Sequence, residues 1–424
     1  MSTPARTNDF DAAMRSLGLG AESECWRDGW RESQASMPPR GPAFLRPGFV
    51  RETCGALGLA DDVREAIVAS LGAFRRQEAL ALLAWHAHRR LFARERSETI
   101  DPVGAKLGWP RDLGALGGGA GMLYPVVLLS GAASLRALHR RRGVDEAITR
   151  DTAGDLELWM RHYRARTGRW GLAQMHWLVN HFLGRLVKLG RLQFHLERFA
   201  YDVRAFRSRR DGRVVLLAPP GARFRRDGQF DGTGGVHDDR AWTAELVETG
   251  GTIRAQAVSP QGRALPEPVV LPAEEWTCIL RRGDAVLGVH IPATGPMSHE
   301  ACGESFRKAA AFFPEHFPEF PFHAFVCTSW FLDEQFGRLL GASSNIRRFQ
   351  EEVYLFPLPG ASDDQTFERV FGHRPADLAG APRDTALRRV IIDHVLAGGH
   401  FHAGGMVLFP EDLDWGRRVY HGKD

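Results

Sequence analysis

A histidine, a cysteine and a serine lie near the ends of two apolar segments in the middle of the chain. His290 is in the segment Ala285–Ile291 (AVLGVHI), and Cys327 and Ser329 end the segment that begins at Phe322 (FHAFVCTS). An imidazole can remove a proton near neutral pH, and a hydroxyl or thiol can protonate a leaving group or attack as a nucleophile. We therefore predict these three residues as catalytic. A structural histidine and a cysteine that is simply a small apolar residue remain open alternatives.

The loop after the first segment has the features of an anion site. Ser298 is a good helix N-cap, and the apolar spacing that follows it predicts a helix. A helix N-terminus offers unpaired N–H groups and the positive end of the helix dipole, which favour a phosphate. We predict that the loop binds such an anion through Thr294, Gly295, Pro296, Met297 and Ser298. A connecting turn that Ser298 merely caps is the alternative.

These residues need a strand–loop–helix–strand unit to bring them together. Two strands joined by one helix lie parallel and close to each other. Alternation along the first strand places Val286, Gly288 and His290 on one face. In open α/β sheets, ligands bind at the carboxyl ends of such strands, so we expect the chemistry there.

The rest of the chain divides into two parts that differ in the spacing of their apolar residues. A chain of 424 residues is too long for one ordinary core. Residues 46–189 show helical periodicity, with one helix expected over 172–188, whereas residues 190–424 alternate like strands between glycine- and proline-rich turns. The prolines at 38, 39 and 42 favour a poorly ordered arm over residues 1–45. The predicted class is α+β, a helical N-terminal domain followed by a mixed sheet domain.

The amino-acid composition narrows the kinds of binding partner and the cellular compartment that we expect for this protein. The net charge is only +4, from 55 basic and 51 acidic residues, which argues against a nucleic-acid or membrane surface. The N-terminus has no apolar signal segment, and the five cysteines form no CxxC pair, so we expect a cytoplasmic protein with reduced thiols. The paired histidines lack the i,i+4 spacing of zinc helices, so we expect no metal. A small-molecule substrate is expected, and no partner protein is predicted.

Three motifs in this region resemble a known family. They are His290-Ile291-Pro292-x-x-Gly295-Pro296, Cys327-x-Ser329-Trp330-Phe331-Leu332 and Ser344-Asn345-Ile346-x-x-Phe349-Gln350, with Arg369-Val370-Phe371-Gly372 and Asp384-Thr385-x-Leu387 fitting as well. Together they resemble the bacterial predicted acyltransferases that have a helical N-acyltransferase N-terminal domain and a GNAT-like C-terminal domain.

The resemblance implies transfer of an acyl group from acyl-CoA to an amine. It implies that the pyrophosphate rests on the loop before Ser298 and that the two central strands splay apart around the pantetheine arm. It also implies that Trp330, Ser344, Asn345 and Gln350 contact the substrate, although Asn345 also fits a turn or cap.

Two other functions stay open. The loop before Ser298 has one glycine and a proline that removes an N–H donor. A loop that binds pyrophosphate less well is consistent with a GNAT-like module that binds a small molecule or partner without turnover. The third hypothesis is a cysteine hydrolase that uses Cys327 and His290.

Overall fold

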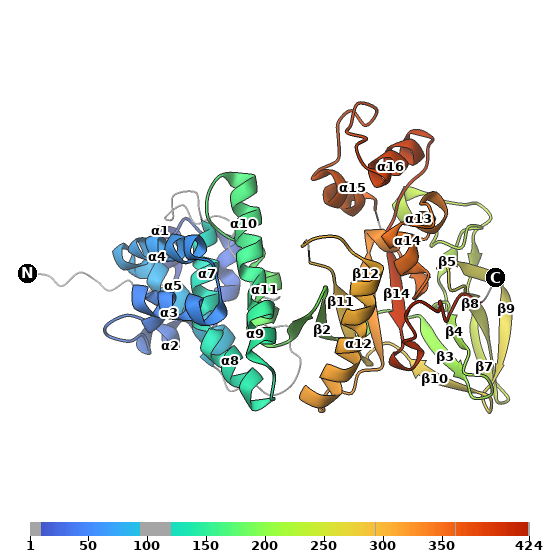
Figure 1. The fold of residues 1–424 in the computed structure, drawn as a ribbon, viewed down its shortest axis with the longest axis horizontal. Helices are drawn as coiled ribbons and strands as arrows, with labels where there is room; N and C mark the ends of the chain where they lie inside the picture. Colours follow the sequence, from blue (N-terminus) through green and yellow to red (C-terminus); the bar gives the residue numbers. More distant parts are fainter. Residues whose placement is uncertain (1–9, 94–119, 293, 361, 423–424) are drawn as a thin grey trace, which may run out of the picture. The chain divides into compact units, whose positions relative to one another are not determined.

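The computed structural model describes residues 10–93, 120–292, 294–360 and 362–422. The chain divides into two units, Met1–Leu189 and Gly190–Asp424, and each is described by itself (Figure 1).

The first unit is built from helices around one apolar core. In α4 the buried residues Val63, Ile67, Leu71 and Phe74 follow helical spacing, and Asp61 and Asp62 in the first turn complement the helix dipole. The described α-helices are α1 (Phe10–Ser16), α2 (Trp30–Ala35), α3 (Pro47–Leu57), α4 (Asp61–Arg76), α5 (Glu78–His88), α7 (Leu123–Ser130), α8 (Ala132–Arg141), α9 (Glu146–Ala153), α10 (Asp155–Thr167) and α11 (Met175–Phe182).

Two expectations for this unit need correction. Residues 10–45 are not a poorly ordered arm, because they form α1, α2 and short 3₁₀ turns whose Phe10, Trp26 and Trp30 are buried in the helical core. Residues 1–9 lie outside the described part of the chain. The helix expected over 172–188 ends at Phe182, and Leu186–Leu189 forms the strand β1 instead.

The described part of the second unit contains two large sheets and a two-stranded one, in which β5 (Arg223–Phe224) pairs with β6 (Trp242–Thr243). Strands β2 (Leu192–Arg198), β11 (Ala285–His290), β12 (Ala324–Ser329), β14 (Gly404–Leu408) and β13 (Tyr354–Pro357) follow one another in that order in the first sheet. The second sheet has the order β10 (Trp276–Leu280), β3 (Arg204–Ser208), β4 (Val214–Leu217), β8 (Thr252–Val258) and β7 (Leu246–Thr249), with β9 (Ala264–Pro272) also paired to β8. The predicted α+β class is confirmed.

Helix α12 (His299–His316) joins β11 to β12, and these two strands pair in parallel, as the strand–helix–strand pattern predicted. Figure 1 shows α12 lying along both strands. Phe306 of α12 packs edge to face on Phe194 and Phe325, with ring centroids 5.9 and 5.1 Å away. The other face of the first sheet shares a core with the second sheet, in which Val286 and Val407 meet Leu216. One face of the first sheet is therefore covered by a helix and the other by a sheet.

Shorter elements follow the carboxyl end of β12. They are η7 (Trp330–Leu332), α13 (Gln335–Leu339), α14 (Asn345–Gln350), α15 (Asp364–Phe371) and α16 (Ala386–Leu396). Within the described residues, no helix combines the length and apolar character that crossing a bilayer requires.

Candidate active site

The parallel pairing of β11 and β12 stops before either strand ends. The paired residues are Val286 with Ala324, Leu287 with Phe325 and Gly288 with Val326. Strand β11 continues to His290 and β12 to Ser329, and β11 stays paired to β2 as far as His290. The two parallel strands thus separate over their last residues, which is the splay that the family resemblance implied.

Two histidines and a glutamate gather on the face of the sheet that carries His290. In the antiparallel register of β2 and β11, His195 lies opposite Gly288 and Glu197 opposite Val286. His195 Nδ1 is 2.6 Å from Glu197 Oε1, and His290 Nε2 is 3.7 Å from the same oxygen. The Glu197 carboxylate therefore links both imidazoles.

The absence of a side chain at Gly288 makes this arrangement possible. A Cβ atom at that position would lie 2.5 Å from the carboxylate of Glu197, which is closer than real atoms approach. The carboxylate occupies the space above Gly288 and extends from its own strand towards His290.

Glu197 carries its negative charge over the whole physiological range. Burial alone would raise its pKa, but the hydrogen bond from His195, the close approach of His290 and the charges of both imidazoles outweigh burial and lower the pKa to about 2. Because the pKa in the folded protein is below the ordinary value of 4.5, this interaction stabilises the fold above about pH 4.5. Its contribution is lost as the pH falls towards 2.

We expect Gly288→Ala to lower activity strongly without unfolding the protein. The added methyl group displaces only the end of the flexible Glu197 side chain, so the change in Tm should be small, whereas the carboxylate moves away from His195. The expected loss is about 10²-fold in kcat, the lower end of the effect of a positioned proton-transfer group. Steady-state kinetics and calorimetric melting of the variant measure both quantities.

Gly55→Ala is the matched control, because Gly55 lies in α3 with open space around it. Full activity in Gly288→Ala would show that the position of Glu197 does not matter.

The loop before α12 is held by one arginine. Arg191 donates hydrogen bonds to the carbonyl oxygens of Pro292 (2.9 Å), Gly295 (3.1 Å) and Pro296 (3.0 Å). Ser298 caps α12, and its side chain accepts a hydrogen bond from Ala301 N at 3.2 Å. These three contacts hold Pro292, Gly295 and Pro296 against Arg191 near the N-terminus of α12. Thr294, Gly295 and Pro296 are exposed there, and Met297 is half-buried.

Cys327 does not meet His290. In β12, Phe325 pairs with Leu287 and Val326 with Gly288, so strand alternation places Cys327 and Ser329 on the face opposite His290. Burial, together with the charge of Glu197, raises the pKa of the Cys327 thiol to about 12. The thiolate that a cysteine hydrolase needs is therefore disfavoured. Ser329 is half-buried at the end of the strand.

The four residues expected to contact substrate have different surroundings. Gln350 is buried and donates both amide hydrogens, to Phe331 O and Asp333 O at 2.8 Å each, so it fixes the turn after β12. Trp330 packs against Phe336. Ser344 precedes α14 as its N-cap position and Asn345 is its first residue, both half-buried. The predicted role of Gln350 as a substrate donor is corrected to a structural one.

His195 and Glu197 were not among the predicted site residues, although the alternation of Leu192–Phe199 already places them on one face. Together with His290 they could also hold a metal ion, because one ligand atom of each lies within 4.8 Å of the others. The expected absence of a metal stays a prediction.

Comparison with known proteins places the chain in a family. The N-acyltransferase N-terminal domain model matches residues 48–184, and the GNAT-like C-terminal domain model matches residues 186–408. None of the curated proteins matches the sequence.

Solved structures of acyltransferases share the fold. One is a complex with decanoyl-CoA and teicoplanin, at 22% identity and a TM-score of 0.64. Another is a complex with decanoyl-CoA alone, at 23% identity and a TM-score of 0.62. Each comparison covers 94% of this chain and 98% of the other. The GNAT-like model alone spans more than half of the sequence, so this chain belongs to the GNAT-like C-terminal domain family and, with its N-acyltransferase N-terminal domain, is an acyltransferase.

Proposed function

We propose that the protein transfers an acyl group from acyl-CoA to an amine acceptor. The observation that carries this proposal is the separation of β11 and β12 beside the cluster of His195, Glu197 and His290. We place the thioester where the pairing of the two strands ends, and the cluster offers a base at the same end of β11. The solved relatives that bind decanoyl-CoA support the same donor.

The donor binds through the loop and the start of α12. The exposed residues Thr294 and Gly295 and the first N–H groups of α12 receive the pyrophosphate, which the helix dipole favours. Arg191 acts indirectly. It binds the carbonyl oxygens of Pro292 and Gly295, so the N–H groups of the loop can point towards the anion instead.

His195 is the best-oriented base. Its Nδ1 donates to Glu197 Oε1 at 2.6 Å, which fixes the tautomer that presents a lone pair on Nε2. Glu197, with a pKa of about 2, is too weak a base itself. His290, predicted from the sequence as the base, is more exposed than His195, at 37% against 16% of the side chain, and passes the proton to solvent.

The reaction forms one bond and breaks one. The amine nitrogen attacks the thioester carbonyl carbon, its proton goes to His195, and the C–S bond breaks to release the thiolate of CoA. Ser329, at the end of β12 on the opposite face of the sheet, is the proposed proton donor to that thiolate and takes up a proton from solvent in turn. Backbone N–H groups of the separated strands polarise the carbonyl oxygen.

Calorimetry with decanoyl-CoA tests donor binding. We expect the wild-type protein to bind decanoyl-CoA and Arg191→Ala to bind it about tenfold more weakly. That factor corresponds to about 1.4 kcal/mol of binding free energy, which is lost because the loop is no longer held in place. Arg198→Ala is the control, because this exposed arginine follows the site on β2 and contacts Gly283 O rather than the loop. Folded protein that gives no heat with decanoyl-CoA or other acyl-CoAs would overturn the proposal.

The single glycine and the proline of the loop favour one other candidate, a module that binds acyl-CoA or another small molecule without turnover. Binding without any release of free CoA in the presence of amines would support that candidate.

A further inference from the structure

His195, Glu197 and His290, which we call the His195 cluster, are residue types that bind metal ions. Among the described residues, this is the only group of three histidine, cysteine or acidic side chains whose ligand atoms, one from each, all lie within 4.8 Å of one another. His195 and Glu197 are two residues apart on β2 and so face the same side, and His290 ends the neighbouring strand β11. The three ligands are therefore held by two paired strands, which position side chains more precisely than loops do.

The distances within the His195 cluster suit a tetrahedral zinc ion. Two ligand atoms that are each about 2.0–2.1 Å from a tetrahedral zinc ion lie about 3.4 Å apart. The observed distances to Glu197 Oε1 are 2.6 Å from His195 Nδ1 and 3.7 Å from His290 Nε2. One distance is below the tetrahedral value and the other is above it, so small side-chain rotations are enough for the three atoms to reach one ion.

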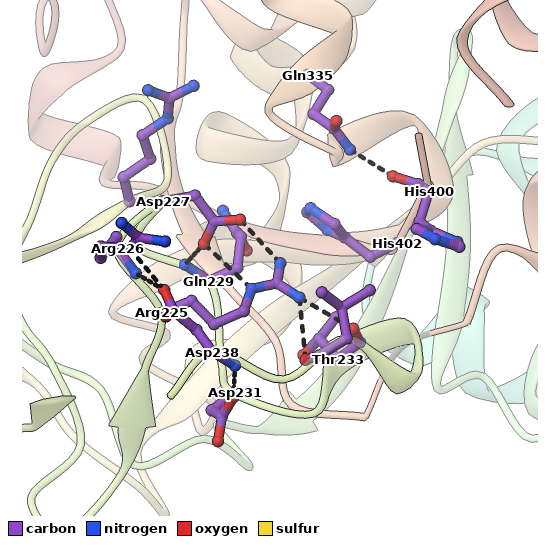
Figure 2. Close-up of polar contacts among 12 residues, drawn as sticks. Arg225, Arg226, Asp227, Gln229, Asp231, Thr233, Asp238, Gln335, His400 and His402 are labelled. Atoms are coloured by element: carbon purple, nitrogen blue, oxygen red, sulfur yellow. Dashed lines mark hydrogen bonds and ion pairs between the residues drawn. The ribbon is translucent and has the colours of Figure 1, made fainter. Parts of the chain in front are cut away.

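The charges in the His195 cluster favour a cation. Within the described residues, no arginine or lysine forms an ion pair with Glu197, whose partners are the two histidines. The carboxylates near Arg225 differ, because Figure 2 shows the Arg225 guanidinium paired with Asp227, at 2.9 Å, and Asp238 is paired with Arg226 at 3.0 Å. A cation would have to displace an arginine from those carboxylates, whereas at Glu197 it displaces only a proton.

The His195 cluster is open to solvent. The side chains of Glu197 and His290 are 38% and 37% exposed. An ion can therefore enter, and a water molecule can occupy the fourth position, as in other zinc sites with three protein ligands. Two imidazoles and one carboxylate suit zinc, whereas magnesium and calcium prefer a shell of oxygen ligands.

An ion in the His195 cluster would disable the proposed base. In the metal-free protein the Nδ1 proton of His195 points to Glu197, which leaves the lone pair on Nε2. When zinc binds Nδ1, an N–Zn bond replaces the N–H bond and the neutral ring carries its proton on Nε2. That nitrogen can no longer accept a proton from the amine. No electron is transferred, and removal of the ion restores the first tautomer.

From these observations we infer that the His195 cluster binds one zinc ion, which reversibly inhibits the enzyme by occupying its base. The ion is an inhibitor and not a cofactor of the reaction. The inhibition rests on the proposed function, whereas binding of the ion does not.

Calorimetry with Zn²⁺ tests binding without turnover, on the full-length protein after dialysis against EDTA. We expect one tight site per chain in the wild type and at least about a hundredfold weaker binding in His290→Ala, since even groups that only support a ligand change metal affinity by about 10- to 100-fold. If His290→Ala fails to fold, Glu197→Gln, which keeps the shape of the side chain, should weaken binding to the same extent.

His237→Ala is the matched control for binding. His237 is an exposed histidine whose Nδ1 lies 3.6 Å from a carboxylate oxygen of Asp231, so it reports adventitious binding by a surface pair, and the variant should keep the tight site. Mg²⁺ and Ca²⁺ should give no heat with the wild type. A wild type that binds no Zn²⁺, or undiminished binding in a folded variant of His290 or Glu197, would overturn the inference.

Inhibition of acyl transfer separates this inference from the proposed function. Zn²⁺ should inhibit the wild type, EDTA should restore its activity, and half-inhibition of the residual activity of His290→Ala should need at least about a hundredfold more Zn²⁺. Both enzymes are compared at the same free Zn²⁺, so capture of the released CoA thiol by the ion affects them equally. Tight Zn²⁺ binding in a protein that acylates no amine would refute the proposed function and keep the metal site. Acylation that is unchanged when Zn²⁺ saturates the site would refute the inhibition and keep the proposed function.

Discussion

Glu197→Gln lowers kcat for amine acylation by about 10²- to 10⁴-fold, the range expected when a positioned proton-transfer system is disabled. Glutamine has nearly the same shape, so the packing above Gly288 is kept. The negative charge that stands 2.6 Å from His195 and 3.7 Å from His290 is lost. An amide can also present its N–H to His195 and reverse the tautomer, so that the lone pair faces away from the amine. The KM for acyl-CoA should change little.

Steady-state kinetics with a fixed acyl-CoA measure this effect, and Glu248→Gln is the matched control. Glu248 is an exposed carboxylate on β7 that pairs with Arg204, so removing its charge leaves both the cluster and the donor loop intact. A Glu197→Gln enzyme within about twofold of wild type would mean that the carboxylate has no part in proton transfer.

His195→Ala has an effect of the same size, and His290→Ala a smaller one. The first variant removes the proposed base and should cost about 10²- to 10⁴-fold in kcat, with partial recovery when free imidazole is added. The second removes only the group that hands the proton to solvent, so the expected loss is about tenfold. The reverse order of the two losses would assign the base to His290, as the sequence alone predicted.

Much of the fold could be predicted because polar and apolar residues alternate along several strands and because glycine and proline mark the turns. The segments 214–217, 252–258 and 276–280 contain β-branched residues and form strands. The prolines before residue 45 were misleading. Trp26 and Trp30 bury fully in the helical core, and large aromatic side chains in that segment already indicated apolar surface that must be covered.

Only part of the candidate active site could be predicted from the sequence. Its parallel strands and the position of His290 follow from the local pattern, whereas the partner strand β2 is about ninety residues away in the sequence and its antiparallel register with β11 cannot be deduced from composition. That register is what brings Glu197 over Gly288. Gln350 was misassigned for the same reason, since its two backbone partners, Phe331 and Asp333, become neighbours only in the folded chain.

Product analysis tests the central claim most directly. The protein is incubated with decanoyl-CoA and a panel of primary amines, and free CoA and the amide products are quantified by mass spectrometry. Acyl transfer predicts an N-decanoyl amide and free CoA in equal amounts, with CoA release that depends on the amine and falls by at least about 10²-fold in Glu197→Gln. Bound decanoyl-CoA that stays intact with every amine offered, or CoA released at the same rate without any amine, would contradict it.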